Sequence, residues 1–231
     1  MRAKGNVMYR FESLAIRGHR ELEVPNTLRL LEEESDRLAF VFPGRGYTAQ
    51  APLLYYTISS LLHNGINVLS VDYQYFNNPD FESLERDEQF RWLYDDVESA
   101  YETVLNEVEL RLEILVGKSL GTIAIGHILD SYPKSSAHKV IWHTPLLLME
   151  EVTQQIEKYR PESLFVIGSA DPHYDENILA RLVEATNGEA VVVDDANHAM
   201  EVPGGVNDSL WAMEKVIDSV GEFVRVKSSQ E

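Results

Sequence analysis

The pattern of hydrophobic and polar residues changes near residue 37. Before that point, apolar and polar positions alternate loosely, as in MYRFESLAI and ELEVPNTLRLL, which predicts one or two antiparallel strands. From Arg37 onward, short apolar runs alternate with segments whose apolar residues recur every three or four positions. The second spacing is that of one face of a helix. The sequence therefore predicts antiparallel N-terminal strands followed by a strand–helix repeat.

The apolar runs are short and rich in valine, isoleucine and leucine, as expected of buried strands. They cover 37–42, 66–72, 112–117, 138–143, 163–170 and 189–195. Helices are predicted at 52–65, 90–108, 120–133 and 176–188, and in a C-terminal segment with Leu210, Met213, Ile217, Val220 and Val224 on one face. Pro52 suits the first turn of its helix, and Asn207-Asp208 is expected to cap the last one.

Strands and helices that alternate at these lengths predict the α/β class, with a mostly parallel central sheet and helices on both faces. Nothing in the composition divides the 231 residues, so we expect residues 1–231 to form a single domain. Ligands of such sheets bind beyond the carboxyl ends of the strands. The loops that follow strands are therefore the places to seek chemistry.

Charge and composition narrow the partners. The chain has 38 Asp and Glu against 20 Lys and Arg, a net charge of −18, which would repel nucleic acids and anionic membranes. It has no cysteine, which excludes disulfides, thiolate metal sites and a cysteine nucleophile. The N-terminal residues lack the apolar core of a signal peptide, so we expect a cytoplasmic protein with a small-molecule substrate. The sequence does not indicate an oligomeric state.

A G-x-S-x-G pattern, GKSLG, centres on Ser119 between the strand 112–117 and the helix 120–133. A sharp strand-to-helix turn holds such a serine in a strained conformation, and the flanking glycines avoid clashes. The serine would project at the N-terminal end of a helix, whose dipole favours negative charge. A serine that only caps the helix is the alternative, but the strand before it and the helix after it favour a nucleophile.

A serine nucleophile needs a base and an acid. His198 follows the last predicted strand, and Asp171 follows the strand 163–170. Both loops lie at the carboxyl ends of strands, as Ser119 does, and the chain order Ser, Asp, His is that of α/β hydrolases. We therefore predict His198 as the base and Asp171 as the acid. The alternatives to this acid role are a simple Asp-Pro turn or one of three nearby carboxylates, Asp175, Asp194 and Asp195.

An oxyanion hole would complete the site. One donor is expected to be the N–H of Leu120, the residue after the nucleophile, and the other an N–H from the loop after the strand 37–42. That loop reads PGRGY, and its glycines would let the backbone approach a tetrahedral intermediate. Arg45 and Tyr47 are both candidate donors. A tight turn without any catalytic role remains the alternative.

On these residues the chain resembles the α/β-hydrolase superfamily, over almost everything from Arg37 to the end. It is most similar to small bacterial members without a large cap, including the esterase-like and dienelactone-hydrolase-like groups. The resemblance implies the α/β-hydrolase fold with a minimal cap, and Ser119, Asp171 and His198 as nucleophile, acid and base. Two departures are the PGRGY loop, where many lipases have H-G-G-G, and a serine where dienelactone hydrolases carry cysteine.

The resulting hypothesis is an acyl-transfer enzyme that hydrolyses a small carboxylic ester through an acyl-enzyme. A thioester, amide or short peptide is the alternative within that class, and a non-catalytic binding protein is the alternative outside it. We expect no cofactor and no metal, because H-E-x-x-H, P-loop and G-x-G-x-x-G patterns are missing. Residues 144–162 leave room for only one short cap helix, which predicts short-acyl substrates.

Two further residue types have structural interpretations. His143 follows the strand 138–143 and could line the pocket or be purely structural. Trp92, Trp142 and Trp211 are expected in helix or strand cores.

Overall fold

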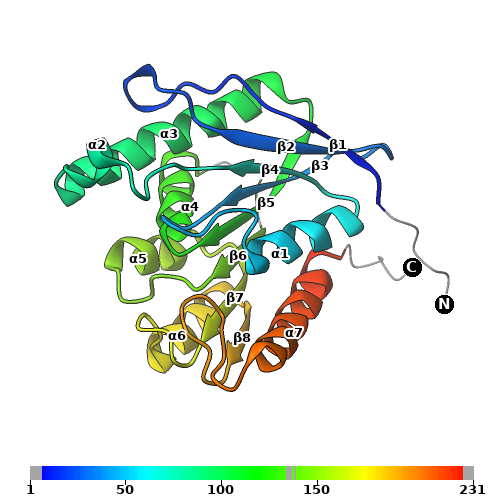
Figure 1. Ribbon diagram of the computed structural model, residues 1–231, viewed down its shortest axis with the longest axis vertical. Coiled ribbons are helices and arrows are strands. Elements are labelled where there is room, and N and C mark those ends of the chain that lie inside the picture. The colour runs from blue at the N-terminus through cyan, green and yellow to red at the C-terminus, as the bar shows by residue number, and fades with distance from the viewer. Residues whose placement is uncertain (1–6, 134–136, 138, 226–231) are drawn as a thin grey trace.

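The computed structural model describes residues 7–133, 137 and 139–225, and within them eight strands form one sheet (Figure 1). The order across the sheet is β1-β2-β4-β3-β5-β6-β7-β8. The strands are β1 (Tyr9–Glu12), β2 (Asn26–Leu31), β3 (Arg37–Phe42), β4 (Asn67–Val71), β5 (Arg111–Lys118), β6 (Lys139–His143), β7 (Glu162–Gly168) and β8 (Glu189–Val193). The β1–β2 and β2–β4 pairs are antiparallel and all the others are parallel. The predicted sheet with antiparallel N-terminal strands is confirmed.

Helices cover both faces of the sheet (Figure 1). They are α1 (Pro52–His63), α2 (Pro79–Glu82), α3 (Arg86–Glu107), α4 (Leu120–Ser131), α5 (Glu150–Tyr159), α6 (Glu176–Thr186) and α7 (Val206–Val224), with a short 3₁₀ turn at His19–Glu21. None of them is long and apolar enough to cross a membrane, judged over the described residues.

The alternation of side chains along each central strand fills two separate cores. In β3, Leu38, Phe40 and Phe42 belong to the core shared with α3 to α6. Ala39 and Val41 face the other side and belong to the core shared with α1 and α7. Because both faces are covered, these strands are continuously apolar rather than alternating, which is the pattern of a buried parallel sheet.

The start of α7 differs from the sequence-based expectation. Its N-cap is Gly205, at φ 136°, and no side chain caps the helix, so the prediction of an Asn207-Asp208 cap is wrong. A positive φ at this position is readily adopted only by glycine, and it starts the helix at Val206, which places Asn207 and Asp208 inside the first turn.

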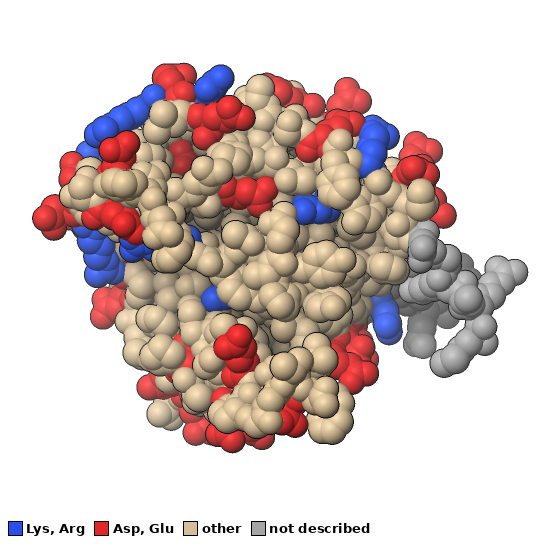
Figure 2. Space-filling view, viewed as in Figure 1, with Lys and Arg blue, Asp and Glu red and all other residues tan. Residues whose placement is uncertain are grey.

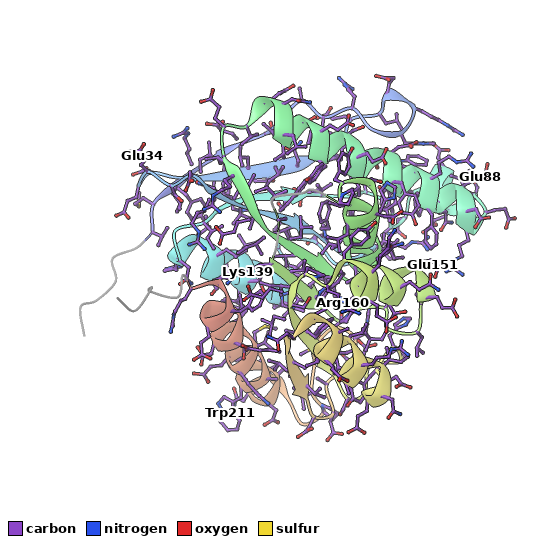
Figure 3. The ribbon with its side chains drawn as sticks, turned by 180° about the vertical axis from the view of Figure 1, so that it is seen from behind. Glu34, Glu88, Lys139, Glu151, Arg160 and Trp211 are labelled. Atoms are coloured by element: carbon purple, nitrogen blue, oxygen red, sulfur yellow. The ribbon has the colours of Figure 1, made fainter. Side chains whose placement is uncertain are left out.

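Two large side chains near the start of α7 are exposed. Trp211 was expected in a core, but it is 70% exposed, whereas Trp92 and Trp142 are buried as expected. Leu210, on the apolar face of the helix, is 52% exposed. Figure 3 shows Trp211 directed away from the body of the protein. The first turns of α7 border a surface groove, and the buried stripe of the helix continues only from Met213 through Val220 to Val224.

Smaller differences occur in the loops. The short helix α2 was not anticipated, because a single turn started by Asn78 and Pro79 has no periodicity to reveal it. His138, the expected first residue of the fourth predicted strand, lies outside the described residues, and β6 begins at Lys139. The other predicted elements match the observed bounds to within a few residues.

A buried ion pair fastens the amino-terminal edge of the sheet. The Arg37 guanidinium donates to both carboxylate oxygens of Glu113, at 2.9 and 2.7 Å, and also to the carbonyls of Asn64 and Val224. One side chain thus joins β3 to β5, to the end of α1 and to the end of α7. Glu113 also pairs with the half-exposed Arg111, at 3.2 Å, but Arg37 is its bidentate partner, and removing such a partner from a buried carboxylate is destabilising.

We expect Arg37→Ala to lower the free energy of unfolding by about 2 kcal/mol, because the Glu113 carboxylate would lose its bidentate partner while it keeps the half-exposed Arg111 at 3.2 Å. The control is Arg10→Ala, which breaks an exposed pair of similar length with Glu12 and should cost less than about 1 kcal/mol. Urea unfolding of both variants measures the difference. Equal losses in the free energy of unfolding would show that the buried pair stabilises the protein no more than the exposed pair does.

Candidate active site

Ser119 occupies the turn between the end of β5 and the start of α4, with φ 53° and ψ −113°. Such a backbone conformation is strained for a residue with a side chain. Hydrogen bonds hold it in place. The Ser119 N–H donates to the carbonyl of His143 at 3.1 Å, and the Thr122 N–H and hydroxyl both donate to the Ser119 carbonyl at 2.8 and 2.6 Å. The serine side chain is only partly buried and is therefore accessible from solvent.

The two glycines of the motif are required by close backbone contacts. A Cβ atom on Gly121 would lie 1.9 Å from the carbonyl oxygen of Phe42, and one on Gly117 would lie 2.6 Å from the carbonyl oxygen of Gly121. Side chains cannot approach backbone oxygens so closely. The first turn of α4 therefore packs directly against the end of β3, and this contact sets the direction of the Ser119 side chain.

His198 is presented by a loop that follows β8. The Asn197 side chain accepts hydrogen bonds from the N–H groups of Ala199 and Glu201, at 2.8 and 3.1 Å, and the Asn197 N–H donates to the Glu201 carbonyl at 2.9 Å. A turn closed in this way by an asparagine side chain has little freedom. It fixes the backbone on either side of His198.

Asp171 reaches His198 because the ends of β7 and β8 touch. A Cβ atom on Gly168 would lie 1.9 Å from the carbonyl oxygen of Ala196, so only glycine permits this approach. The Ala170 N–H donates to the same carbonyl at 3.1 Å. As a result the loop after β7 and the loop that carries His198 lie side by side.

The structure brings Ser119, His198 and Asp171 into one hydrogen-bonded line. His198 Nε2 is 2.9 Å from Ser119 Oγ, and His198 Nδ1 is 2.7 Å from Asp171 Oδ2. A carboxylate can only accept, so Nδ1 carries the proton and Nε2 is free to accept from the serine hydroxyl. Burial acts to raise the pKa of Asp171, but the hydrogen bonds from His198 and from the His173 N–H outweigh it, and the pKa lies below its usual range.

The competing carboxylates occupy other positions. The Asp175 side chain accepts from the N–H of Ile178 and caps α6. Asp194 and Asp195 are exposed. Among the described acidic residues, Asp171 alone is hydrogen-bonded to His198.

The PGRGY loop lies directly beside Ser119. A Cβ atom on Gly44 would come within 3.4 Å of Ser119 Cβ, so glycine allows the loop to approach the serine. The Tyr47 N–H donates to the Gly44 carbonyl at 3.4 Å. Within the described residues, the N–H groups of Arg45 and Leu120 have no intramolecular acceptor. These two groups are therefore available to a ligand, whereas the Tyr47 N–H is engaged in the turn.

The environment of His143 is a structural one. The ring is fully buried, and its Nε2 lies 3.0 Å from the Thr57 hydroxyl of α1. Burial, with a further contribution from the Lys118 charge, lowers the pKa of His143 to about 3, so the ring is neutral. It supports the turn from beneath through its carbonyl, which accepts from the Ser119 N–H.

Two neighbours of the site were not singled out from sequence. The His173 ring lies 5.6 Å from the His198 ring, and the backbone N–H of His173 donates to Asp171 Oδ1 at 2.8 Å. The Lys118 side chain is buried beside the site. The lysine that directly follows the apolar ILVG segment of this strand was the one available signal for Lys118.

A groove of about 470 Å³ opens next to His198. It is bordered mainly by apolar side chains from the starts of α1 and α7 and from the loop after His198, among them Tyr47, Pro52, Ala199, Val202, Leu210 and Met213. Glu201 also lines it. The face that carries α1 and α7 is largely uncharged at its centre, with acidic side chains gathered toward its edges (Figure 2). The volume of the groove is typical of a small-molecule site, for which the range is roughly 300–1,000 Å³.

The described residues contain no cluster of three histidine or carboxylate side chains that could hold a metal ion. The side chains gathered here offer a hydroxyl, an imidazole and a carboxylate in sequence. That arrangement suits the activation of a hydroxyl nucleophile.

Comparison with solved structures shows the fold. The chain is similar to a dienelactone hydrolase from Anabaena variabilis (17% identity, TM-score 0.68, covering 93% of this chain and 96% of that one). It is also similar to Est1E from Butyrivibrio proteoclasticus, solved with ferulic acid (13%, 0.70, 94% and 97%), and to the Pyrococcus furiosus esterase Pf2001 (16%, 0.67, 97% and 97%). No family profile and no curated protein sequence matches. These structures belong to the α/β-hydrolase superfamily, and this chain has the α/β-hydrolase fold.

We expect Gly121→Ala to lower the free energy of unfolding by about 1–3 kcal/mol, because the added methyl group would be forced against the Phe42 carbonyl. Gly126→Ala, one and a half turns along α4, is the matched control. Its added Cβ would meet its nearest atom at an ordinary 3.5 Å, so helix propensity should leave it neutral or up to about 1 kcal/mol more stable. Chemical denaturation measures both. Equal effects would refute the steric role assigned to Gly121.

Proposed function

We propose that this protein is a serine hydrolase that cleaves a small carboxylic ester through an acyl-enzyme. The observation that carries the proposal is the continuous line from Ser119 Oγ through His198 to Asp171, with contacts of 2.9 and 2.7 Å. Three loops that are distant in sequence deliver these groups to the carboxyl edge of the sheet, where ligands bind in open α/β sheets. Ser119 is partly exposed, whereas Asp171 is buried.

The proposed reaction has two halves. His198 Nε2 takes the proton of the Ser119 hydroxyl as its oxygen attacks the ester carbonyl, and a C–O bond forms. The tetrahedral intermediate collapses, the bond to the alcohol breaks, and His198 returns the proton to the departing oxygen. Water then enters, gives a proton to His198 and attacks the acyl carbon. The bond from that carbon to Ser119 Oγ breaks as His198 returns the proton to Oγ, which releases the acid and restores Ser119. Asp171 orients the imidazole and stabilises its charged form.

The negative oxygen of the intermediate needs donors that are already in place. We assign the N–H of Leu120 and, from the PGRGY loop, the N–H of Arg45, because both lack an intramolecular acceptor within the described residues. The Arg45 side chain turns away towards Phe81 and Glu82, so its contribution is that of the backbone. The dipole of α4, which begins at Leu120, favours the same negative charge.

The surroundings of the site favour an ester with a small apolar group. The single helix α5 spans Glu150–Tyr159 in the connection where larger caps are inserted, and Leu148 before it is exposed. Leu146, Leu147 and Val152 pack into the core instead. The groove beside His198 is apolar but of limited volume. The esterases of similar fold are consistent with this substrate class.

We expect Ser119→Ala to lower kcat for p-nitrophenyl acetate at least about a thousandfold, and His198→Gln to do the same, because the two act as one unit. Asp171→Asn should cost less, since the acid orients the base but takes no proton itself. Steady-state kinetics on variants with native circular dichroism measures this. The control is Asp195→Asn, an exposed acid at positive φ that asparagine also tolerates. A comparable loss of kcat in Asp195→Asn, together with an active Asp171→Asn, would assign the acid role to Asp195 instead.

We expect kcat/KM for p-nitrophenyl esters to rise over the first few acyl carbons and then to level off or fall. Each buried methylene is worth about 0.8 kcal/mol only while there is apolar surface to bury it. Leu210→Glu should raise KM for the butyrate ester about fivefold by placing a charge in the groove. Leu105→Glu, equally exposed but on α3, is the control. Continued increase up to palmitate, or a jump above the micelle concentration, would contradict the small-substrate assignment.

A further inference from the structure

Lys118 is a buried cation immediately before the nucleophile. It is the last residue of β5, which lies between β3 and β6, and it is only 2% exposed. Lysine is almost never buried to this degree without a specific partner. The strand has otherwise apolar residues at its centre, so an apolar side chain would satisfy the packing. The presence of an ammonium group here calls for a function.

The ammonium group connects the loops that carry the site. Lys118 Nζ donates to the backbone carbonyl of His198 at 3.1 Å. It also lies 4.7 Å from the centre of the Tyr47 ring, in a cation–π contact. The Tyr47 hydroxyl in turn accepts the Leu53 N–H in the first turn of α1, at 2.9 Å. One side chain therefore fastens the His198 loop and the PGRGY loop to the turn at Ser119.

The titratable groups that face Lys118 include Asp171 and His173 from the loop after β7, His143 from β6 and Tyr47 from the PGRGY loop. Asp171 after β7 acts favourably on the ammonium, while no carboxylate in the described residues lies within ion-pair distance of it. The histidines around it, His143 in the adjacent strand and His173 beside Asp171, both have their pKa lowered by burial and, in part, by the Lys118 charge. Burial lowers the pKa of Lys118 itself to about 8.

We propose that Lys118 is a positioning residue of the active site, whose ammonium group holds the His198 base and the oxyanion loop in register with Ser119. This inference rests on the proposed hydrolase function. It predicts that the loss of the ammonium affects the rate of the chemical steps more than substrate binding. Because catalytic geometry must be held within a fraction of an ångström, a small displacement of His198 is costly.

The chain offers a matched control at the amino-terminal ends of the parallel strands. Lys139, labelled in Figure 3, donates from Nζ to the Phe223 carbonyl at 2.8 Å and lies 5.1 Å from the centre of the Phe223 ring. It therefore makes the same two kinds of contact as Lys118, and in addition a 3.5 Å ion pair with the half-exposed Glu162. Because it begins β6, it lies at the amino end of a parallel strand, away from Ser119. Lys139→Met removes similar interactions without touching the site.

The experiment compares Lys118→Met, Lys118→Arg and Lys139→Met. We expect Lys118→Met to lower kcat for p-nitrophenyl acetate about 10- to 100-fold with KM changed less than about threefold. The wild-type rate should decline above about pH 8 as the ammonium loses its proton. Lys118→Arg stays charged throughout this range, so it should retain part of the activity and lose that decline. Lys139→Met should keep the wild-type kcat and pH profile.

Amide hydrogen exchange provides a readout that does not depend on activity. Lys118→Met should speed exchange of residues 197–201 and 44–47, where the tethered loops lie, and Lys139→Met should not. Unchanged kcat and exchange in Lys118→Met would overturn the proposal, as would an alkaline decline that persists in Lys118→Arg. A wild-type protein that hydrolyses no ester would refute the proposed function, while the exchange comparison would still decide whether Lys118 holds the loops.

Discussion

The site depends on one constraint, the strained backbone of Ser119 between β5 and α4. A positive φ at a residue with a side chain persists only where its surroundings fix it, and here the end of β3 does so. The Phe42 carbonyl fits against Gly121 with no room for a Cβ atom, and the His143 carbonyl binds the Ser119 N–H. The side chain is aimed by these backbone contacts. Everything else at the site is arranged around that direction.

The other groups of the site, like the turn at Ser119, lie in loops that follow parallel strands. The carboxyl ends of β3, β5, β7 and β8 meet at one edge, and each is followed by a loop. Close approach at Gly168 brings the Asp171 and His198 loops together, and Gly44 brings the PGRGY loop to Ser119. Lys118 then ties two of these loops to the turn from beneath. Glycines allow the close approach of these loops, and polar contacts fix their positions relative to one another.

Periodicity predicted the strands and the longer helices, because each of these elements has its own pattern, whereas the single turn of α2 has none. The run at 37–42 was expected as a strand and is β3, and Pro52 begins α1 as expected. The predicted cap of α7 failed because a glycine at positive φ replaced a side-chain cap. Trp211 and Leu210 are apolar but exposed. The sequence could not predict this, because periodicity shows which face of a helix is apolar but not where the element that covers it ends.

The candidate site was predicted from chain order and loop position, which place residues on an edge but do not measure contacts. The hydrogen bond between Ser119 and His198 joins residues 79 positions apart, and no local pattern encodes its length. Four aspartates could have served as the acid from sequence. The close approach of Gly168 to Ala196 selects the loop that carries Asp171, and that contact exists only in the folded chain. The burial of Lys118 is likewise a property of the strand order.

The measurement that tests the account most directly is covalent labelling with a fluorophosphonate, followed by mass spectrometry of the peptide that contains Ser119. An activated serine attacks the phosphorus and displaces fluoride, whereas an ordinary serine hydroxyl is too weak a nucleophile. We predict one adduct, on Ser119, formed by the folded protein and not after denaturation, and strongly slowed in His198→Gln. A folded protein that takes up no label at Ser119 would contradict the account and favour a non-catalytic binding role on the same fold.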